Sequence, residues 1–411
     1  MSKRAPAKKH KKKKYPALLV AVLIILVIAG PIFFLFVRFS SIGQIHPSIS
    51  GPNQISTGSL NISWPASTED AIGVSGYGLL SESSNQAASP TASIAKILTA
   101  LSVLRVKPLV LGEQGPVITI SSADVNSYLT YQAEGGSVVK VSQGEQITEY
   151  QALEAMLLPS ANNMADTLVN WAFGSMDNYT SYANNYAKLI GMSSTHIADA
   201  SGFSPQTVSS PTDLIVLGQT ALNNQTIAQI IAQKSAVIPV AGTVSNVNWL
   251  LGQNGVIGIK TGNTDQAGGC YLFAANYDEG KQVITIIGDV SKASTLQNAI
   301  DDGANLIDQV RPQIQTINLS ATSLENVEYK STWGQNSSAT ATDQETLSYI
   351  PGMILKEQVS TKSIRVPSMQ GKIVGQITIS SGADSISSAL ALKNSINKPG
   401  WLWVLEHPSK I

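Results

Sequence analysis

The segment that decides the fold reads TASIAKILTA, from Thr91 to Ala100, in a chain of 411 residues. Apolar residues recur in it, and on through Leu101 and Leu104, with the spacing of a buried helix. Ser93 and Lys96 stand three positions apart, so a helix places both side chains on one face. An apolar setting disfavours the ammonium ion and lowers the pKa of a lysine, which leaves an amine that can act as a base. The pair therefore predicts a nucleophilic serine with its own base.

Two other Ser-x-x-Lys strings lack this helical context. Ser137–Lys140 reads as a strand, in which positions three apart face opposite ways. In Ser395–Lys398 the lysine precedes Pro399, and a residue before proline disfavours helix. A bare Ser-x-x-Lys pair is common, so the interpretation of Ser93 and Lys96 depends on the rest of the chain.

Composition narrows the classes of function. The chain has 27 Lys and Arg residues against 27 Asp and Glu residues, so no global charge favours nucleic acid. Its single cysteine, Cys270, excludes an internal disulfide and is expected to be a packed thiol. Its four histidines show no metal-ligand spacing. We therefore predict neither a metal nor a cofactor.

The N-terminus predicts a membrane anchor. Residues 1–16 form a basic tail, and residues 17–37 are uncharged and almost wholly apolar, long enough to cross a bilayer. The basic flank stays in the cytoplasm, which places the rest of the chain outside the membrane. A cleaved signal peptide is the alternative, and Gly30-Pro31 either kinks the helix or marks a shorter apolar core. Residues 38–59, rich in Ser, Gly, Pro and Ile, read as a tether.

The middle of the chain alternates strand-like and helical segments. After Thr148, which has capping-box spacing to Gln151, a helical section is interrupted at Pro159. Other helices are expected at 177–190, from Ser210, and at 294–310. Strands are expected at 71–80, 117–120, 137–141, 256–259, 271–275 and 283–287.

Residues 316–411 have a different texture. They show short strand-like runs at 352–355, 373–379 and 401–406, separated by turns. No acid–base constellation is evident among them. We therefore expect a separate small β domain there.

Three motifs stand in a fixed order along the chain: Ser93 to Lys96, Ser160-Ala161-Asn162, and Lys260-Thr261-Gly262. The first is expected on a helix, the second at a break between helices and the third at the end of a strand. Each is common alone, but serine β-lactamases and penicillin-binding proteins combine all three in this order.

The chain resembles the low-molecular-mass penicillin-binding proteins of the D-alanyl-D-alanine carboxypeptidase family, peptidase family S11. Blocks at 90–100, 154–166, 191–214 and 255–270 are similar to those of the family. The resemblance implies an α+β transpeptidase fold of the penicillin-binding and β-lactamase type over residues 60–312. In this fold, helices and a helical subdomain flank an antiparallel sheet. Residues 316–411 resemble the family's β-rich C-terminal domain more loosely.

Two features depart from the family pattern. The middle motif carries Ala161 where Asp or Gly is usual, a side chain that the mechanism does not need. Many members attach through a C-terminal amphipathic helix, which we do not expect here, and the N-terminal anchor is expected to replace it.

The resemblance implies a catalytic role for three residues. Ser93 is the expected acyl-accepting nucleophile, Lys96 its base, and Ser160 the relay that carries the proton to the leaving amine. The reaction implied is release of the terminal D-alanine from a peptidoglycan stem peptide ending in D-alanyl-D-alanine. β-Lactams mimic that terminus and are expected to acylate Ser93.

The resemblance also implies the substrate-binding residues. Asn162 bonds the substrate amide or Lys96, while Lys260 and Thr261 hold the terminal carboxylate. Gly262 lets the substrate backbone lie against the strand edge. The backbone N–H groups of Ser93 and Asn263 form the oxyanion hole.

Alternatives stay open at this level. A class A β-lactamase shares the three motifs, but no Glu-x-x-Leu-Asn pattern occurs around 195–199, where Asp199 is the only acid. An acylable but inactive wall-binding scaffold is a second alternative. The sequence does not separate carboxypeptidase from endopeptidase, and it does not define the stem peptide or the oligomeric state. His196 is expected to be structural.

Overall fold

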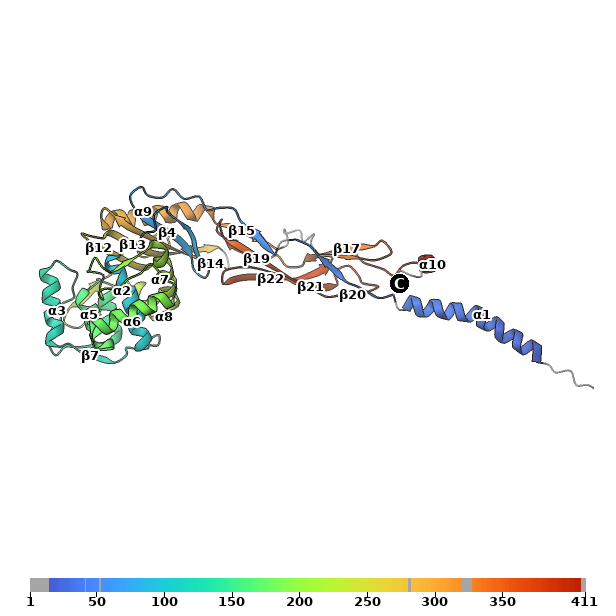
Figure 1. Cartoon of the computed structure of the whole chain (residues 1–411), viewed down its shortest axis with the longest axis horizontal. Helices are drawn as coiled ribbons and strands as arrows, with labels where there is room; N and C mark the ends of the chain where they lie inside the picture. The colour runs from blue at the N-terminus through green and yellow to red at the C-terminus, as the bar shows by residue number, and fades with distance from the viewer. Residues whose placement is uncertain (1–14, 41, 52, 280–281, 320–326, 408–411) are drawn as a thin grey trace, which may run out of the picture.

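The computed structural model describes residues 15–40, 42–51, 53–279, 282–319 and 327–407. The molecule is elongated (Figure 1). A body of mixed helices and strands lies at one end, a long β-rich domain follows, and helix α1 (Tyr15–Ser40) extends from the other end. This arrangement confirms the predicted α+β body with a separate β-rich C-terminal domain.

A five-stranded antiparallel sheet forms the centre of the body, in the order β12-β13-β14-β4-β5. The strands are β4 (Glu69–Val74), β5 (Gly78–Glu82), β12 (Val256–Thr264), β13 (Gly268–Glu279) and β14 (Gln282–Ala293). The single strand expected at 71–80 is in fact the β4–β5 hairpin, because the chain turns at Gly76, where φ is +79°. The strands predicted at 256–259, 271–275 and 283–287 are confirmed.

Side chains alternate between the two faces of this sheet. On one face, Tyr271 and Phe273 pack against α9 (Leu296–Val310). On the other, Leu272 and Ala274 join the core of the helical subdomain. The strand β12 lies at the edge of the sheet, which leaves its outer side beside the segment that carries Ser93.

The helical subdomain packs against the second face. Thr148 and Gln151 form the predicted capping box, and Ser210 caps the next predicted helix start. The helices are η1 (Ala92–Ile94), α2 (Ala95–Val106), α3 (Ser122–Ala133), α4 (Glu149–Leu157), α5 (Asn162–Phe173), α6 (Met176–Leu189), α7 (Pro211–Asn223) and α8 (Gln225–Ile231). Three short two-stranded sheets accompany them: β6 (Ser89–Pro90) with β9 (Val208–Ser209), β7 (Val117–Thr119) with β8 (Gln146–Thr148), and β10 (Ser235–Ile238) with β11 (Gly242–Ser245).

The strand predicted at 137–141 is wrong. The Asn163 side chain takes the place of a strand partner, since its Oδ1 accepts from the Val139 N–H at 3.0 Å and its amide donates to the Val139 carbonyl at 2.9 Å. A side chain thus satisfies the backbone groups that a ladder would otherwise have paired.

The C-terminal domain is built on a seven-stranded sheet in the order β2-β16-β17-β22-β21-β19-β3. Its strands include β2 (Pro47–Ile49), β3 (Gln54–Ser56), β16 (Val327–Lys330), β17 (Asn336–Ala341), β19 (Ile354–Thr361), β21 (Ile373–Ser381) and β22 (Asp384–Leu392). Two small pairs complete the domain: β1 (Gln44–Ile45) with β20 (Ile364–Arg365), and β15 (Gln315–Asn318) with β18 (Thr346–Tyr349).

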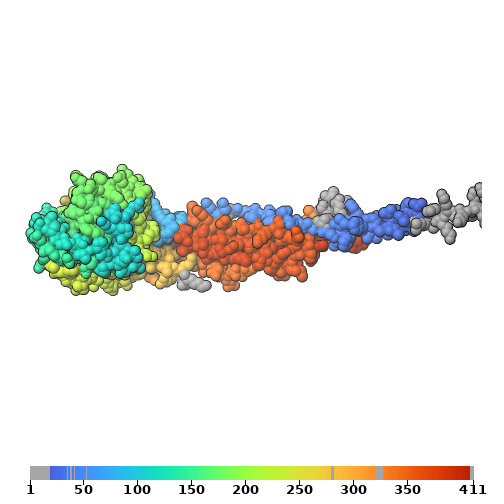
Figure 2. Space-filling view, turned by 90° about the horizontal axis from the view of Figure 1, so that it is seen from below, coloured from blue at the N-terminus to red at the C-terminus, as the bar shows by residue number. Residues whose placement is uncertain are grey.

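Residues 38–59 are therefore not a tether. Within this range β1, β2 and β3 all pair with strands from the C-terminal half of the chain. Figure 2 shows this N-terminal segment lying along the C-terminal domain. Ile45 is buried in the core of that domain, so the segment gains the apolar burial that a free linker lacks.

The strand predicted at 401–406 is also wrong, because α10 (Trp401–Glu406) is a short helix that contacts α1. Val404 faces the core while Trp401 and Leu402 are exposed, so a short terminal helix with one buried side is present where none was expected. Six residues are too few to show a helical period clearly, which explains the error.

Helix α1 contains Pro31 and continues through it to Ser40. Among the described residues, no helix combines the length and the apolar character that crossing a membrane requires. Residues 1–14 of the predicted basic tail at 1–16 lie outside the described residues.

Candidate active site

The structure brings Ser93 and Lys96 together as predicted. Ser93 lies in the 3-10 turn η1, which leads directly into α2, and Lys96 is the second residue of that helix. The two side chains meet, with Lys96 Nζ 2.8 Å from Ser93 Oγ. Lys96 is completely buried in a helix whose neighbouring positions are also buried, so the amine is cut off from water.

Lys96 Nζ has two further partners, the Asn162 Oδ1 at 2.7 Å and the Ser201 carbonyl at 3.0 Å. Burial, and then the charge of Lys260, lower the pKa of Lys96 well below its ordinary value. A neutral amine has two N–H donors and one lone pair. It can donate to Asn162 and Ser201 while its lone pair accepts the Ser93 hydroxyl proton.

The second motif lies between α4 and α5, as predicted. Ser160 is buried and has a left-handed backbone with φ of +68°, which turns the chain between the two helices. Its Oγ accepts from Lys260 Nζ at 3.0 Å. Ser160 therefore contacts Lys260, and Asn162 contacts Lys96.

The third motif lies on β12. Lys260 is buried and also donates to the Thr261 carbonyl at 3.0 Å. Burial lowers the pKa of Lys260 to about 7. Of the two buried ammonium groups, Lys96 is the one that loses its proton first, since the charge of Lys260 adds to its burial.

Gly262 brings β12 close to the nucleophile. A Cβ atom at this position would lie 3.0 Å from the Ser93 backbone nitrogen and 3.0 Å from the Ala92 Cβ. Only glycine allows this approach without displacing the turn that holds Ser93. The next residue, Asn263, is exposed in the cleft beside Ser93.

A loop from Asp199 to Thr207 supplies a part of the site that the sequence interpretation missed. The Asp199 carboxylate accepts from the backbone N–H of Phe203 at 2.9 Å and from the Ser201 hydroxyl at 2.8 Å. Thr207 donates to its other oxygen. The carboxylate thus holds the loop that presents the Ser201 carbonyl to Lys96.

Gly202 fits the same loop against the nucleophile segment. Its φ is +72°, and a Cβ atom there would lie 1.8 Å from the Ala92 carbonyl oxygen. Gly202 lies in the block at 191–214 that is similar to the family, but spacing alone does not show that a backbone carbonyl from this block contacts Lys96.

A partly buried network beside the site was also missed. Asp166 on α5 accepts from the Ser127 hydroxyl at 2.8 Å and lies 3.5 Å from the Tyr131 hydroxyl. Burial raises the pKa of Asp166 to about 6. Tyr131 meets the Phe203 ring edge-on at 5.4 Å, so α3 supports the Asp199–Thr207 loop.

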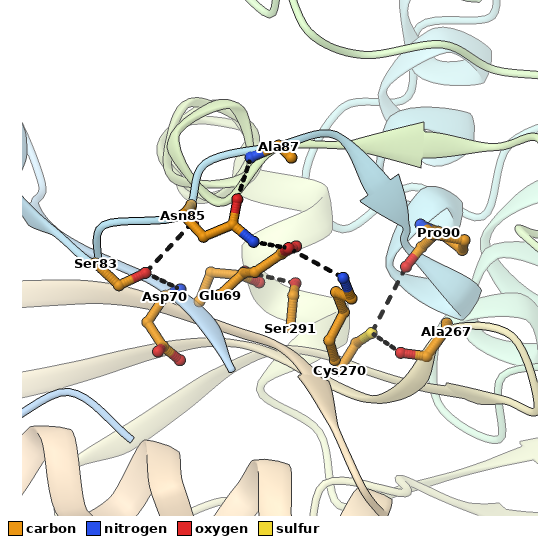
Figure 3. A network of polar contacts seen from close by, with 11 residues as sticks. Glu69, Asp70, Ser83, Asn85, Ala87, Pro90, Ala267, Cys270 and Ser291 are labelled. Carbon is orange, nitrogen blue, oxygen red and sulfur yellow. Dashed lines mark hydrogen bonds and ion pairs between the residues drawn. The ribbon is translucent and has the colours of Figure 1, made fainter. Parts of the chain in front are cut away.

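A second polar network ties the segment before Ser93 to the sheet (Figure 3). Glu69 pairs with Lys292 at 3.1 Å and accepts from the Asn85 amide at 2.6 Å. Ser83 accepts from the Asp70 N–H at 2.9 Å. Cys270 is buried, with Sγ 3.9 Å from the Pro90 carbonyl, which agrees with the expected packed thiol.

This network contains carboxyl groups that are too deeply buried to ionise easily. One oxygen of Asp70 and one of Asp289 have no partner among the described residues. Burial is the main cause that raises the pKa of Asp70 to about 7, and burial also raises that of Asp289. The folded protein therefore binds protons here that the unfolded chain releases near pH 4.

We expect Asp70→Asn to stabilise the protein at alkaline pH. The stability associated with a raised carboxyl pKa is complete below the unfolded pKa and is lost as pH rises through about 7. At pH 8.5 the free energy of unfolding of the amide variant should exceed that of wild type by about 1–3 kcal/mol, which appears as a higher melting temperature. At pH 5 the variant should gain little or nothing. Asp308→Asn, an exposed change on α9, is the control in pH-dependent thermal melts. A gain that is equal at both pH values would contradict the assignment.

Two cavities flank the sheet. One, of about 450 Å³, opens on Ser93, Asn162 and Asn263, and is the candidate active-site cleft. The other, of about 570 Å³, lies at the opposite end of the sheet between the body and the C-terminal domain and contains no motif residue. We assign the chemistry to the smaller cavity because it contains the nucleophile.

His196 is exposed and does not line the cleft, and its backbone pairs with that of Val208. Among the described residues, no three His, Cys, Asp or Glu side chains are grouped so that they could hold a metal ion.

Comparison with known families agrees with this geometry. Residues 74–292, more than half of the chain, match the model of a family described as D-alanyl-D-alanine carboxypeptidase, peptidase family S11. The matched range contains all three motifs and the Asp199–Thr207 loop.

Two curated proteins illustrate the similarity. D-alanyl-D-alanine carboxypeptidase DacB2 of Mycobacterium tuberculosis is 31% identical over 207 residues, which cover 49% of this chain and 67% of that protein. DacF of Bacillus subtilis, of the same description, is 21% identical over 343 residues, which cover 80% of this chain and 85% of the relative.

Solved structures share the fold. A Streptomyces DD-transpeptidase superposes with a TM-score of 0.54 at 24% identity, over 60% of this chain and 98% of its own. The carboxypeptidase DacD of Francisella tularensis gives a TM-score of 0.54 at 18% identity and covers 84% of this chain and 96% of its own.

Proposed function

The chain belongs to the D-alanyl-D-alanine carboxypeptidase family, peptidase family S11. We propose that it is a serine-type carboxypeptidase that removes the terminal D-alanine from peptidoglycan stem peptides. The observation that carries the proposal is the contact between Ser93 Oγ and a fully buried Lys96 Nζ at 2.8 Å. A buried amine held by two acceptors is a base that can activate the serine at neutral pH.

The proposed reaction begins with proton transfer from Ser93 Oγ to the neutral Lys96. The alkoxide forms a bond to the carbonyl carbon of the penultimate D-alanine, and the backbone N–H groups of Ser93 and Asn263 hold the oxyanion. Ser160, within hydrogen-bond distance of Lys260, relays the proton that Lys96 took from Ser93 to the leaving amine, so that Lys96 becomes neutral. The amide bond breaks, D-alanine leaves, and an ester on Ser93 remains.

Water then completes the cycle. Lys96, neutral again, takes a proton from a water molecule that attacks the ester carbonyl. The C–O bond to Ser93 breaks, the serine regains its proton, and the shortened peptide leaves with a new carboxylate. The reaction needs no redox step and no cofactor.

In this proposal the substrate carboxylate binds at Lys260 and Thr261. Both side chains are buried, so the charge interaction is only weakly screened by water. An arriving carboxylate favours the charged form of Lys260, whose pKa is otherwise held at about 7 by burial. Asn162 contacts Lys96 and lines the cleft, where it can also bond the substrate amide.

The geometry does not favour the β-lactamase alternative. That mechanism uses a carboxylate to activate the water that hydrolyses the acyl-enzyme. Asp199, the acid considered for this role, already accepts hydrogen bonds from several groups of its own loop. A stable acyl-enzyme with β-lactams is therefore expected.

The test is covalent labelling of the full chain in detergent, with intact mass as the readout. Wild type should gain one penicillin per chain and Ser93→Ala none. Wild type should also release D-alanine from Nα-acetyl-L-lysyl-D-alanyl-D-alanine. Rapid drug hydrolysis without an adduct favours the β-lactamase. An adduct without D-alanine release favours the acylable scaffold. If neither an adduct nor drug hydrolysis is observed, the proposed mechanism is excluded.

We also propose, from the uncharged apolar run at 17–37 in the sequence and although no helix of the described residues meets the requirements of a membrane span, that this segment of α1 holds the protein in the cell membrane, with the catalytic body outside the cytoplasm. The apolar side chains of α1 are exposed, as at Leu26 (65%) and Phe33 (68%), and lipid would cover them. The basic residues at 3–14 favour a cytoplasmic N-terminus. Wild type should stay in the membrane pellet after an alkaline wash, and recovery in the supernatant would contradict the proposal.

A further inference from the structure

We infer that the cavity between the catalytic body and the C-terminal domain binds an uncharged sugar, an N-acetylhexosamine of the glycan strand that carries the stem peptides. The inference rests on the proposed function, because its ligand is the polymer to which those peptides are attached. It is carried by the position of the cavity, by two buried hydroxyl groups that lack a strong partner, and by a lining with one charged side chain.

This cavity, of about 570 Å³, shares no lining residue with the cleft at Ser93. On the side of the body it is lined by the β4–β5 turn, the end of α7 and the start of β14. The C-terminal domain lines the other side, through β18 and the β21–β22 turn. The two turns meet closely, since a Cβ atom at Gly382 would lie 2.6 Å from the Gly76 carbonyl oxygen. Both domains therefore build the cavity, and ligand sites of this size are frequent at domain interfaces.

Two serine side chains of the C-terminal domain line the cavity. Ser348 and Ser381 are only 6% and 4% exposed. The Ser348 hydroxyl forms no hydrogen bond with another described residue, and the bond from this serine to the Gln282 side chain comes from its backbone N–H. The Ser381 hydroxyl has only the Met353 thioether at 3.9 Å, a weak acceptor. Buried polar groups are ordinarily hydrogen-bonded, so both hydroxyls are available to a ligand.

The polar groups on the side of the body are neutral. Asn223 accepts from the Gln219 amide at 3.2 Å, and no described residue accepts from the amide N–H groups of Asn223. Asp384 is the one charged side chain of the lining among the described residues, and it forms no ion pair with them. A lining without a cation does not favour phosphate or carboxylate ligands. Sugar hydroxyls both donate and accept, so they match this mixture of amide, hydroxyl and carboxylate groups.

Apolar surface lies beside these polar groups. Val283 lines the cavity and is 51% exposed. Tyr77 also lines it, and its hydroxyl accepts from the Ile354 N–H at 3.0 Å, which fixes the ring at the domain junction. The C–H face of a sugar ring can cover such surface while its hydroxyl and acetamide groups reach the polar side chains. The lining therefore fits an N-acetylated sugar better than an ion.

The cavity and the cleft lie at opposite ends of β13. Gly269 pairs with Asn263, which lines the cleft, and Asn276 pairs with Thr285, which lines the cavity. At about 3.3 Å per residue, the strand between these pairs spans about 23 Å, whereas an extended tripeptide spans about 10 Å. A short peptide in the cleft therefore does not reach the cavity. A glycan strand with several stem peptides can occupy both sites, and the second contact raises its apparent affinity.

The first experiment measures D-alanine release by the full chain in detergent from two substrates. One is Nα-acetyl-L-lysyl-D-alanyl-D-alanine, and the other is soluble, uncross-linked peptidoglycan strands that keep their D-alanyl-D-alanine termini. Asn223→Ala combined with Asp384→Asn removes two exposed polar groups of the cavity. This double variant should lower kcat/KM about tenfold on the strands, since linked contacts multiply affinity, and leave kcat/KM on the peptide unchanged. Asp308→Asn, an exposed change on α9, is the charge control and should keep both values.

The second experiment detects the sugar directly, by saturation-transfer NMR with N,N′,N″-triacetylchitotriose. Wild type should transfer saturation to this sugar, also after penicillin has blocked Ser93, and the double variant should not. No transfer with wild type, or loss of transfer on acylation by penicillin, would overturn the inference. An unchanged kcat/KM on the strands in the double variant would overturn it too. Failure to release D-alanine from either substrate would remove the proposed function, whereas binding of the sugar would still be measured.

Discussion

Lys96→Met is expected to lower the rate of Ser93 acylation by at least about 10³-fold while the protein stays folded. Methionine fills a similar volume but cannot accept the serine proton, and loss of a nucleophile's base typically costs several orders of magnitude. Stability should change by no more than about 1–2 kcal/mol. The Asn162 Oδ1 and the Ser201 carbonyl lose their hydrogen-bond donor, which destabilises the fold. The variant also avoids the free-energy cost of burying an amine, which offsets this loss.

The measurements are penicillin acylation, D-alanine release and thermal melting of the full chain. Lys107→Met, at the C-terminal end of the same helix, is the matched control and should acylate at the wild-type rate. Lys107 contacts the Trp171 ring and takes no part in the site. Acylation of Lys96→Met within tenfold of wild type would show that another group takes the serine proton.

The catalytic motifs could be predicted from the sequence because each is short and locally determined. The helical spacing around Ser93 fixes its meeting with Lys96, and a break at Pro159 fixes the place of Ser160 and Asn162. Their convergence across the chain could not be derived from spacing. It followed from the resemblance, and the contact between Lys260 and Ser160 agrees with it.

The errors have a common physical origin. Val139 satisfies its backbone groups with the Asn163 side chain, and residues 44–56 pair with strands nearly 300 positions away. The local composition of a segment does not predict such distant partners. The segment at 38–59 is rich in loop-forming residues, yet its place in the C-terminal sheet is decided by strands that the chain supplies much later.

The Asp199–Thr207 loop shows the same limit at the site itself. Its importance depends on a backbone carbonyl, that of Ser201, which any residue type could supply. The only sequence signals were an acid two positions before a serine and a glycine after it. Such a pattern predicts a turn that caps its own N–H groups, without indicating that the turn contacts the catalytic lysine.

Asp199→Ala is expected to lower kcat/KM by about 100-fold and to destabilise the protein by about 2–3 kcal/mol. The substitution removes the acceptor for the Phe203 N–H and the Ser201 and Thr207 hydroxyls, and buried donors left unpaired cost about 1–3 kcal/mol each before the loop relaxes. The Ser201 carbonyl is then no longer held against Lys96.

Asp199→Asn separates the positioning role from a merely structural one. Burial lowers the pKa of Lys96 most, and the charge of Asp199 is among those that oppose this shift. Loss of that charge lowers the Lys96 pKa further, so the acid limb of kcat/KM should move to lower pH. Asp213→Asn is the matched control, because Asp213 holds the neighbouring Ser194 and Thr195 in the same way. Its variant should lose stability without moving the acid limb, and identical pH profiles for the two variants would reduce Asp199 to a structural residue.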